Sequence, residues 1–375
     1  MEFVIRRDEF LECLSTVTTI TSSKEISSIV GNVLLEAEDN YISITATDLE
    51  KSLRNRVPAL VSKKGSILLP GKKLTELVKG FRYDTMKFMS VGEKVVVQNG
   101  NPEQERKYKT HIEIMGMPSD EFPIPFQVNK LEFHSMSSVM VQEMINKVFY
   151  ASAVDDARIV FNGIFVEFRE DLLHFVATDG RRLALIKRKE ENFLNGRTMI
   201  IPLKSVKEIK RLLADSEEIQ IAHNPNENQV YIKSGDIYFS TKLIEGNFPD
   251  YTYVIPTDLP HRAEIYREDF INAIRQAMVF APEPNKQVQL HFSPNILMVV
   301  SSTPELGKVE DGIECNYDGP NMAIGFNSNY LLDVLEALTS NHVVMSFKNP
   351  ESPVLFHDPN DENFLCIVMP MKIHE

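Results

Sequence analysis

The sequence predicts an α+β protein made of three similar domains, and three observations carry that prediction. Segments with helical spacing of apolar residues alternate with short segments of strand character. The same succession of segments occurs three times along the chain. At 375 residues, with 43% hydrophobic and 25% charged residues, the chain is globular in composition and too long for one ordinary core. A repeat of this length indicates domains rather than a solenoid.

Each third opens with a strand that leads directly into a helix. The evidence for the helix is a set of apolar residues three and four positions apart, which form one apolar stripe on the helix surface. The residues of these stripes are Phe10, Cys13, Leu14 and Val17; Val141, Met144, Ile145 and Val148; and Phe270, Ala273, Ile274 and Met278.

A tight turn between two strands occurs in similar form in the first and second thirds. The motif Ala-Thr-Asp precedes Leu49 in the first copy and Gly180 in the second. Glycine adopts positive φ without steric strain. Because the first copy has leucine, we infer that the turn itself does not require glycine, and that the bare backbone of Gly180 serves another purpose. The alternative is that the two copies form different types of turn.

A second strand and helix follow in each third, and a pair of strands closes it. The second strands begin around Ile67, Met199 and Met322, and each runs into a helix with apolar spacing. Proline-containing segments separate the thirds. We therefore predict domains at residues 1–128, 129–258 and 259–375.

Charge is distributed unevenly among the thirds. The net charge of −13 by itself speaks against nucleic acid as a partner, and the last third is the most acidic. Nevertheless, the second helix of each of the first two thirds is locally basic. A solvated helix face is the usual explanation, and a surface that faces phosphates is the alternative. The basic residues are Lys72, Lys73 and Lys79 in the first third, and Lys204, Lys207 and Arg211 in the second.

Motifs for catalysis, metal binding and membrane insertion are not found. The cysteines Cys13, Cys315 and Cys366 are odd in number and far apart, which favours reduced thiols in a cytosolic protein and argues against a zinc site. The segment from Gly65 to Lys73 has five residues between its glycines, whereas a phosphate-binding loop has four. The N-terminus has no apolar signal-type region, and no apolar run could span a bilayer. We expect a protein without cofactor or metal that is not an enzyme.

A set of short segments spread over the whole chain matches one known protein family. The segments are Gly31-Asn-Val-Leu-Leu35, Ala46-Thr-Asp-Leu-Glu50, Phe161-Asn-Gly163, Ala177-Thr-Asp-Gly-Arg-Arg-Leu-Ala184, Glu245-Gly-Asn-Phe-Pro-Asp-Tyr251, Ile324-Gly-Phe-Asn327, Tyr330-Leu-Leu-Asp-Val-Leu335 and Val368-Met-Pro-Met-Lys372. Through them the chain resembles the bacterial replicative sliding clamps, the β subunits of DNA polymerase III, over essentially its whole length. The similarity implies three clamp domains per chain, with helices lining a hole and sheets outside, and a head-to-tail dimer that forms a six-domain ring around duplex DNA.

The resemblance also implies a binding site for a short peptide motif of partner proteins, between the second and third domains. The implied partners are the polymerase III catalytic subunit, the clamp loader and other proteins with a clamp-binding motif. For Leu183 and Ile367, packing in the core is the alternative role. The apolar pocket would involve Phe161, Thr178, Gly180, Arg182, Leu183, Pro249, Val254, Ile367 and Met369, and the adjoining groove Arg158, Arg181, Asn327, Tyr330, Pro353, Pro370 and Met371.

Some residues depart from the family pattern. Ile159 and Val160 stand where aromatic residues are frequent, Arg181 where histidine is common and Tyr253 where arginine is. The chain also continues with His374-Glu375 past the family's usual end. These departures bear on the shape of the groove and on its ligand preference.

The implied function is that of a processivity factor in DNA replication, a cytoplasmic and nucleoid-associated ring that tethers the polymerase and contacts no membrane. The alternative is a peptide-binding scaffold of the same fold that does not encircle DNA. Three similar domains in a row leave unpaired ends, so a head-to-tail contact can close the ring. The DNA-facing residues would be Lys24, Lys72, Lys73, Lys79, Lys204, Lys207 and Arg211. The dimer contact would join Met278 and Val279 on the first helix of the last third to Ile112 and Ile114 on an edge strand of the first third.

Overall fold

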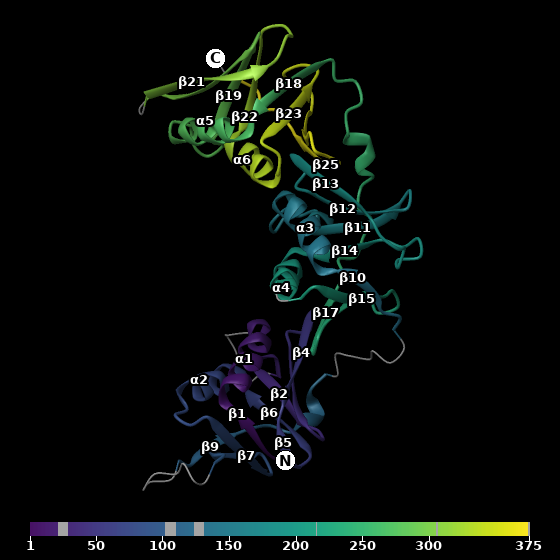
Figure 1. The fold of residues 1–375 in the computed structure, drawn as a ribbon, viewed down its shortest axis with the longest axis vertical. Coiled ribbons are helices and arrows are strands. Elements are labelled where there is room, and N and C mark those ends of the chain that lie inside the picture. The colour runs from purple at the N-terminus through teal and green to yellow at the C-terminus, as the bar shows by residue number, and fades with distance from the viewer. Residues whose placement is uncertain (22–28, 102–109, 124–130, 215, 305–306, 374–375) are drawn as a thin grey trace. The chain divides into compact units, whose positions relative to one another are not determined.

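The structure is a computed structural model that describes residues 1–21, 29–101, 110–123, 131–214, 216–304 and 307–373 (Figure 1). Lys24, His374 and Glu375 lie outside the described residues, as does the predicted boundary between residues 128 and 129. The chain divides into two compact units. Unit 1 comprises Met1–Ser138 and Leu212–Lys242, and unit 2 comprises Val139–Arg211 and Leu243–Glu375.

Unit 1 contains two antiparallel sheets and two helices that pack against each other, α1 (Arg7–Val17) and α2 (Gly71–Gly80). The strand orders are β5-β1-β7-β8-β9 and β10-β15-β16-β17-β4-β3-β2-β6. The strands are β1 (Glu2–Arg6), β2 (Asn32–Ala37), β3 (Tyr41–Thr47), β4 (Lys51–Pro58), β5 (Leu60–Lys63), β6 (Gly65–Pro70), β7 (Thr85–Val91), β8 (Lys94–Asn99), β9 (Ile112–Met115), β10 (His134–Ser137), β15 (Glu218–Asn224), β16 (Gln229–Ser234) and β17 (Ile237–Lys242).

Unit 2 contains one twelve-stranded sheet and four helices. The strand order is β14-β11-β12-β13-β25-β24-β23-β18-β21-β20-β19-β22. The helices are α3 (Ser138–Val148), α4 (Leu203–Leu213), α5 (Arg267–Val279) and α6 (Ser328–Ala337), and the strands are β11 (Gly163–Arg169), β12 (Leu172–Thr178), β13 (Arg182–Lys189), β14 (Met199–Pro202), β18 (His261–Tyr266), β19 (Gln287–Ser293), β20 (Ile296–Thr303), β21 (Gly307–Asn316), β22 (Met322–Asn327), β23 (His342–Phe347), β24 (Val354–Asp358) and β25 (Asp361–Val368).

The predicted threefold repeat of elements is confirmed. Strand and first helix recur as β1-α1, β10-α3 and β18-α5, and the second helices α2, α4 and α6 follow β6, β14 and β22. The apolar stripes of the first helices are buried as predicted, except that Met278 is half-buried, while its neighbour Ala277 is fully buried. Ala277 lies almost two full helical turns after Phe270 and therefore faces the core more directly than Met278 does.

The same strand pairing joins consecutive repeats twice. In unit 1, β17 of the second repeat pairs with β4 of the first, with Ser240 opposite Ser52. In unit 2, β25 of the third repeat pairs with β13 of the second, with Ile367 opposite Leu183. We call the β4–β17 pair the first junction and the β13–β25 pair the second junction. Because of the first junction, the second repeat is divided, and its strands β10 and β15–β17 belong to unit 1.

The two Thr-Asp turns have the same conformation, which decides between the two interpretations of the sequence. Leu49 has φ of 73° and Gly180 has φ of 85°, so both positions are left-handed. In each turn the threonine hydroxyl accepts a bond from the amide of that residue, at 3.0 Å from Leu49 N to Thr47 and from Gly180 N to Thr178. The proposal of different turn types is wrong. The inference that the turn does not require glycine is confirmed, because Leu49 adopts the same left-handed conformation, although leucine does so only with strain.

Candidate functional site

An apolar cluster lies on the second junction and uses strands from both repeats that meet there. Its buried residues come from β11–β14 and from β25, and a segment that follows β17, residues 245–254, packs over them. We call residues 245–254 the covering segment. The buried members are Phe165, Val176, Leu183, Leu185, Ile200, Tyr251 and Ile367, and the partly buried ones packed against them are Val160, Ile244, Phe248, Ile255, Leu355 and Leu365.

Aromatic contacts attach the covering segment to the sheet. The ring of Phe248 stacks on Phe165 with centroids 4.6 Å apart, and it meets Phe161 edge to face at 5.9 Å. Tyr251 meets Phe165 edge to face at 6.4 Å. Such offset and edge-to-face pairs are the favourable arrangements of aromatic rings. The covering segment is thus fixed on the face of the sheet where Leu183 and Ile367 lie.

The segments that border the cluster carry exposed apolar side chains. Tyr253 is 88% exposed, and Val154, Ile159, Val254 and Met369 are between 40% and 75% exposed. Exposed apolar groups that border an apolar cluster are typical of a surface that binds another protein. Val254 and Met369 were predicted as pocket residues, and the structure places them at the edge of the cluster, because Met369 N donates to Arg181 O at 2.9 Å.

Arg158 lies across the bare backbone of Gly180. Its guanidinium pairs with Asp156, donates to Asp179 O at 3.0 Å, and lies 4.5 Å from the centre of the Phe161 ring. A Cβ atom on Gly180 would be 2.7 Å from an amino nitrogen of this guanidinium. The pairing with Arg158 lowers the pKa of Asp156 to about 2. The absence of a side chain at Gly180 therefore leaves room for Arg158 at the edge of the site.

Arg182 joins the two repeats beneath the site. It donates to Asp179 at 3.1 Å, to Tyr150 O at 2.6 Å and to Asp333 of α6, and its guanidinium lies 4.3 Å from the ring centre of Tyr330. Because each of its three guanidinium nitrogens donates a hydrogen bond inside the chain, Arg182 supports the site rather than offering a free cation to a ligand.

The remaining predicted site residues fall into three groups. Leu183 and Ile367 are only 4% and 3% exposed, so they form the floor of the site and also part of the core. Thr178 is engaged in the turn, and Asn327 caps α6 by accepting from Asn329 N at 2.9 Å. The others are at least partly accessible, namely Arg181, Pro249, Pro353, Pro370 and Met371.

The sequence interpretation missed several residues of the site. Phe165, Phe248 and Tyr251 are central to the cluster, and His174 and Glu167 contact Tyr251. A signal was present, because Phe248 and Tyr251 belong to a segment that matches Glu121-Phe-Pro in the first repeat. Only its proline was taken as a site residue.

The predicted basic helix faces are exposed in both units. Lys72, Lys73 and Lys79 lie on α2, and Lys204 and Lys207 lie on α4. Lys73 pairs with Glu76 at 3.2 Å. Among the described residues, no carboxylate pairs with Lys204 or Lys207, so these charges face solvent. Arg211 is likewise exposed and pairs with Glu208 at 3.2 Å.

The residues predicted for the dimer lie on accessible surfaces. Ile112 and Ile114 are half-buried on β9, which is an edge strand as predicted. Val279 at the end of α5 is 69% exposed, and Met278 is half-buried.

The cysteines are buried and unpaired, and burial raises the pKa of Cys366 to about 12. Within the described residues, no cluster of three or more His, Cys, Asp or Glu side chains is arranged to bind a metal ion. None of the helices in the described part of the chain has the length and apolar character needed to span a bilayer.

Comparison with known proteins agrees with this architecture. Models of the N-terminal, central and C-terminal domains of the DNA polymerase III beta subunit match residues 1–126, 135–250 and 252–372. The beta sliding clamp of Haemophilus influenzae is 30% identical over 379 residues, and that of Escherichia coli K12 is 29% identical over 377 residues, each match covering 100% of both chains.

Solved structures resemble the whole chain as well. A DNA polymerase sliding clamp from Pseudomonas aeruginosa has a TM-score of 0.89 at 28% identity, and one from Caulobacter crescentus has 0.91 at 26%, with full coverage of both chains in each case. Another clamp from Pseudomonas aeruginosa was solved bound to griselimycin. The chain therefore belongs to the DNA polymerase III beta subunit family and is a DNA sliding clamp, a non-catalytic processivity factor of replication.

Proposed function

We propose that two copies of the chain close head to tail into a ring around duplex DNA in the cytoplasm, and that the second junction binds peptide segments of the polymerase III catalytic subunit, the clamp loader and other partners. The observation that carries the ring is an unused pair of strand edges. The chain forms the same kind of strand junction twice. It also contains the two strands that a third junction of this kind would need, but these two strands do not pair with each other within the chain.

The two free halves are β9 and β21. β9 follows β8 as β17 follows β16 and β25 follows β24, yet its outer edge is unpaired among the described strands. β21 holds the place that β4 and β13 have in the other repeats. It pairs with β18 only at Cys315 and Asn316, so its edge from Gly307 to Glu314 is open. Open edges of this kind accept a further strand.

The register of the two existing junctions can be transferred to the proposed one. Met117 and Met371 form β-bridges to equivalent residues of β6 and β22, so the two methionines are themselves equivalent. Glu113 of β9 and Ile367 of β25 each lie four residues before these methionines and are therefore equivalent as well. Lys308 is the β21 residue equivalent to Leu183. The transferred register therefore sets Glu113 opposite Lys308 and, two residues further on each strand, His111 opposite Glu310. Both pairs combine an acidic with a basic side chain.

The end of α5 supports the same pairing independently. Val279 is equivalent to Tyr150, because each lies twelve residues after the first residue of its helix. The hydroxyl of Tyr150 is 2.9 Å from Sγ of Cys366 at the second junction. Ile112 is the β9 residue equivalent to Cys366. In the proposed dimer Val279 therefore meets Ile112, the contact expected from the sequence.

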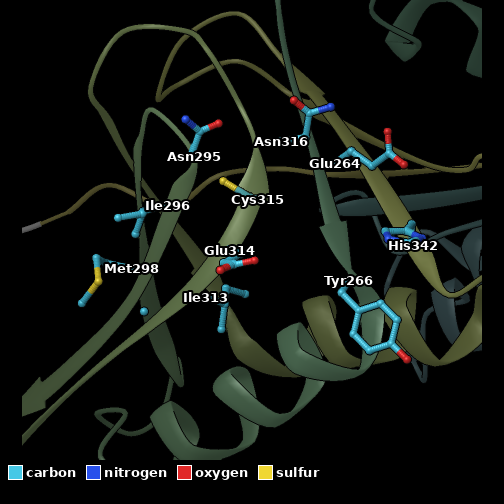
Figure 2. A pocket seen from close by; sticks show the side chains of 11 residues that line it. Glu264, Tyr266, Asn295, Ile296, Met298, Ile313, Glu314, Cys315, Asn316 and His342 are labelled. Atoms are coloured by element: carbon cyan, nitrogen blue, oxygen red, sulfur yellow. The ribbon is translucent and has the colours of Figure 1, made fainter.

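A cavity of about 870 Å³ lies beside the open edge, where β18 and β21 diverge (Figure 2). Glu264 and Glu314 make it acidic, and Tyr266 and Met298 add apolar surface.

The basic helices supply the proposed contact with DNA. Lys72 on α2 and Lys204 on α4 are exposed cations at equivalent places in two repeats, and Lys207 is a further exposed cation on α4. Contacts from such residues to phosphates carry no sequence information, which suits a ring that slides.

Retention on closed and open DNA tests the ring. The protein is loaded onto a nicked plasmid by a clamp loader, unbound protein is removed by gel filtration, and half of the sample is cut once with a restriction enzyme. We expect retention on the circle and loss from the linear DNA. Val279→Asp, which places a charge in the proposed seam, should be retained on neither.

Two results would contradict the ring. Equal retention on circular and linear DNA would mean that direct affinity holds the protein. Failure to stay on the circle, with peptide binding intact, would favour the scaffold that does not encircle DNA.

A further inference from the structure

A polar group is buried beneath the covering segment. The hydroxyl of Tyr251 donates to Oε1 of Glu167 at 2.6 Å, and Nδ1 of His174 is 2.7 Å from the same hydroxyl oxygen. Glu167 and His174 face each other across β11 and β12. His174 is 3% exposed and Tyr251 is 5% exposed. Hydrogen bonds at such depth are shielded from water and depend on each partner.

The donors and acceptors of this group fix its protonation. Because the hydroxyl of Tyr251 donates its one hydrogen bond to Glu167, its oxygen must accept a hydrogen bond from Nδ1–H of His174. Nε2 of His174 then carries no proton, and it is buried without a hydrogen-bond partner among the described residues. Burial, together with the nearby cations Lys187 and Arg169, lowers the pKa of His174 to about 4. The histidine is therefore neutral at pH 7 and acts as a donor of one hydrogen bond.

The covering segment has few other attachments. The backbone bond before it runs from Ile244 N to Ile200 O at 2.9 Å. Within residues 245–254, Tyr251 is the only buried residue, and Phe248 is the only other apolar residue that packs on the cluster. Backbone segments with so few contacts open easily unless side chains hold them.

Two predicted site residues depend on this attachment. Pro249 lies two residues before Tyr251, and Val254 closes the short 3₁₀ helix Tyr251–Val254 that Tyr251 begins. The first repeat has no such group, because its residues equivalent to Glu167 and His174 are Glu36 and Ser43, which are likewise cross-strand neighbours. We call the hydrogen-bonded group of Tyr251, Glu167 and His174 the anchor. The anchor is thus found at the second junction and not at the equivalent place of the first.

We propose that Tyr251, held by Glu167 and His174, is a positioning residue that keeps the covering segment on the sheet, so that the site is formed before a partner peptide arrives. The proposal rests on peptide binding at the second junction. A site formed in advance binds more tightly, because less ordering remains for the bound state. Loss of the anchor should therefore weaken binding without any loss of direct contact to the peptide.

Calorimetric titration with a synthetic peptide tests the proposal. The peptide is the C-terminal clamp-binding segment of the polymerase III catalytic subunit, and the protein is the full chain. We expect Tyr251→Phe and His174→Leu to weaken binding roughly tenfold, the size of one buried hydrogen bond to a charged or strongly polar group. His174→Asn, which retains a donor near the position of Nδ1, should bind within about twofold of wild type.

Tyr317→Phe is the matched control. Tyr317 is as buried as Tyr251, and its hydroxyl donates to Pro320 O at 2.7 Å in the third repeat. This variant loses a buried hydroxyl bond outside the site, so its peptide affinity should equal that of wild type. Hydrogen exchange of the amides of residues 247–254 should be faster in Tyr251→Phe and unchanged in Tyr317→Phe.

The outcomes separate the anchor from the site itself. If Tyr251→Phe lowers stability as Tyr317→Phe does but binds the peptide like wild type, the hydroxyl is only structural and the proposal is overturned. If His174→Asn binds as weakly as His174→Leu, the histidine is not acting as the donor. If wild type does not bind the peptide at all, the proposed function of the second junction fails, whereas faster exchange in Tyr251→Phe would still support the anchor.

Discussion

The two junctions share their backbone and differ in their outer faces. At the first junction, Ser52 lies opposite Ser240, and both are buried. Two residues further along, Arg54 lies opposite Tyr238, with its guanidinium 4.7 Å from the ring centre. The side chains on this face of the strand pair are hydroxyls and a cation–π pair. These four side chains form no apolar surface for a ligand.

At the second junction the same four places are apolar. Leu183 lies opposite Ile367, and Leu185 lies opposite Leu365. All four belong to the cluster under the covering segment. The comparison teaches that main-chain hydrogen bonds join the repeats at both junctions, whereas four side chains decide whether a junction also carries an apolar cluster. The proposed function therefore places the partner site at the second junction only.

The turn at each junction gives the largest expected effect. Gly180→Leu should abolish binding of the polymerase peptide, because the new side chain meets the Arg158 guanidinium and occupies the edge of the site. Leu49→Gly, at the equivalent place of the first junction, should leave binding unchanged. It should also increase the stability of unit 1 slightly, since it relieves positive φ at an exposed leucine.

Calorimetric titration measures the first effect, and hydrogen exchange of the β3 and β4 amides measures the second. Dimer formation of Gly180→Leu, followed by native mass measurement, is the control for folding. Equal peptide affinity of Gly180→Leu and wild type would place the site elsewhere.

Giving the second junction the composition of the first is the next largest change. Leu183→Ser removes a buried apolar side chain, so we expect unit 2 to lose about 4 kcal/mol of stability and the peptide to bind more weakly. Ser52→Ala at the first junction removes a hydroxyl that donates to Thr47 Oγ1 at 2.8 Å and should cost about 1 kcal/mol. Because a chain of several domains does not unfold in one step, amide exchange in β13 and in β4 is the suitable measurement.

Similar losses in the two variants would mean that the two junctions do not differ in apolar packing. Unchanged peptide affinity of Leu183→Ser would assign Leu183 to the core alone, the alternative role that the sequence left open.

The sequence predicted the repeats, the helices and the edge strand, because these depend on periodicity within short segments. The apolar spacing of Phe10 to Val17 is sufficient to predict α1. The sequence did not predict how the second repeat is divided, since the pairing of β17 with β4 is a contact between distant segments. It also could not decide whether the turns at Leu49 and Gly180 are of one type, because a strained φ at a non-glycine residue leaves no mark in composition.

The site was predicted in part for a similar reason. Leu183, Ile367 and Met369 were found through resemblance, and the structure brings them to one face. Tyr251 and His174 were missed, because their hydrogen bond depends on the register of β11 and β12 and on the path of the covering segment. Neither can be derived from the spacing of residues along the chain.

The pH dependence of the two junctions should differ. His174 has a pKa of about 4 in the folded chain, against 6.5 as its ordinary value. Between these values the unfolded chain binds a proton that the folded chain does not, so stability falls as pH falls from 6.5 to 4. We expect wild type to lose up to about 3 kcal/mol more than His174→Asn over this range. The equivalent Ser43 of the first junction does not titrate.

Amide exchange in β12 and β4, measured at several pH values, tests this difference. The loss should be confined to unit 2 and should diminish in His174→Asn. A parallel loss in β4 of wild type, or the same pH dependence in the variant, would assign the effect to other groups.

The smallest expected effect concerns the cation–π contacts of the first junction. Besides Arg54, the ring of Tyr238 has Arg56 at 5.9 Å and Lys233 at 5.6 Å from its centre. Tyr238→Leu keeps an apolar side chain but removes the aromatic ring that attracts these three cations. We therefore expect the stability of unit 1 to fall by about 1 kcal/mol. The loss should shrink as salt is added, because salt screens the repulsion among the cations. Amide exchange in β4 and β17 at low and high salt measures it, with Tyr41→Leu as a control that removes a ring near Arg56 alone. A loss that does not depend on salt would mean that the ring acts by packing, and that the first junction differs from the second in shape rather than in charge.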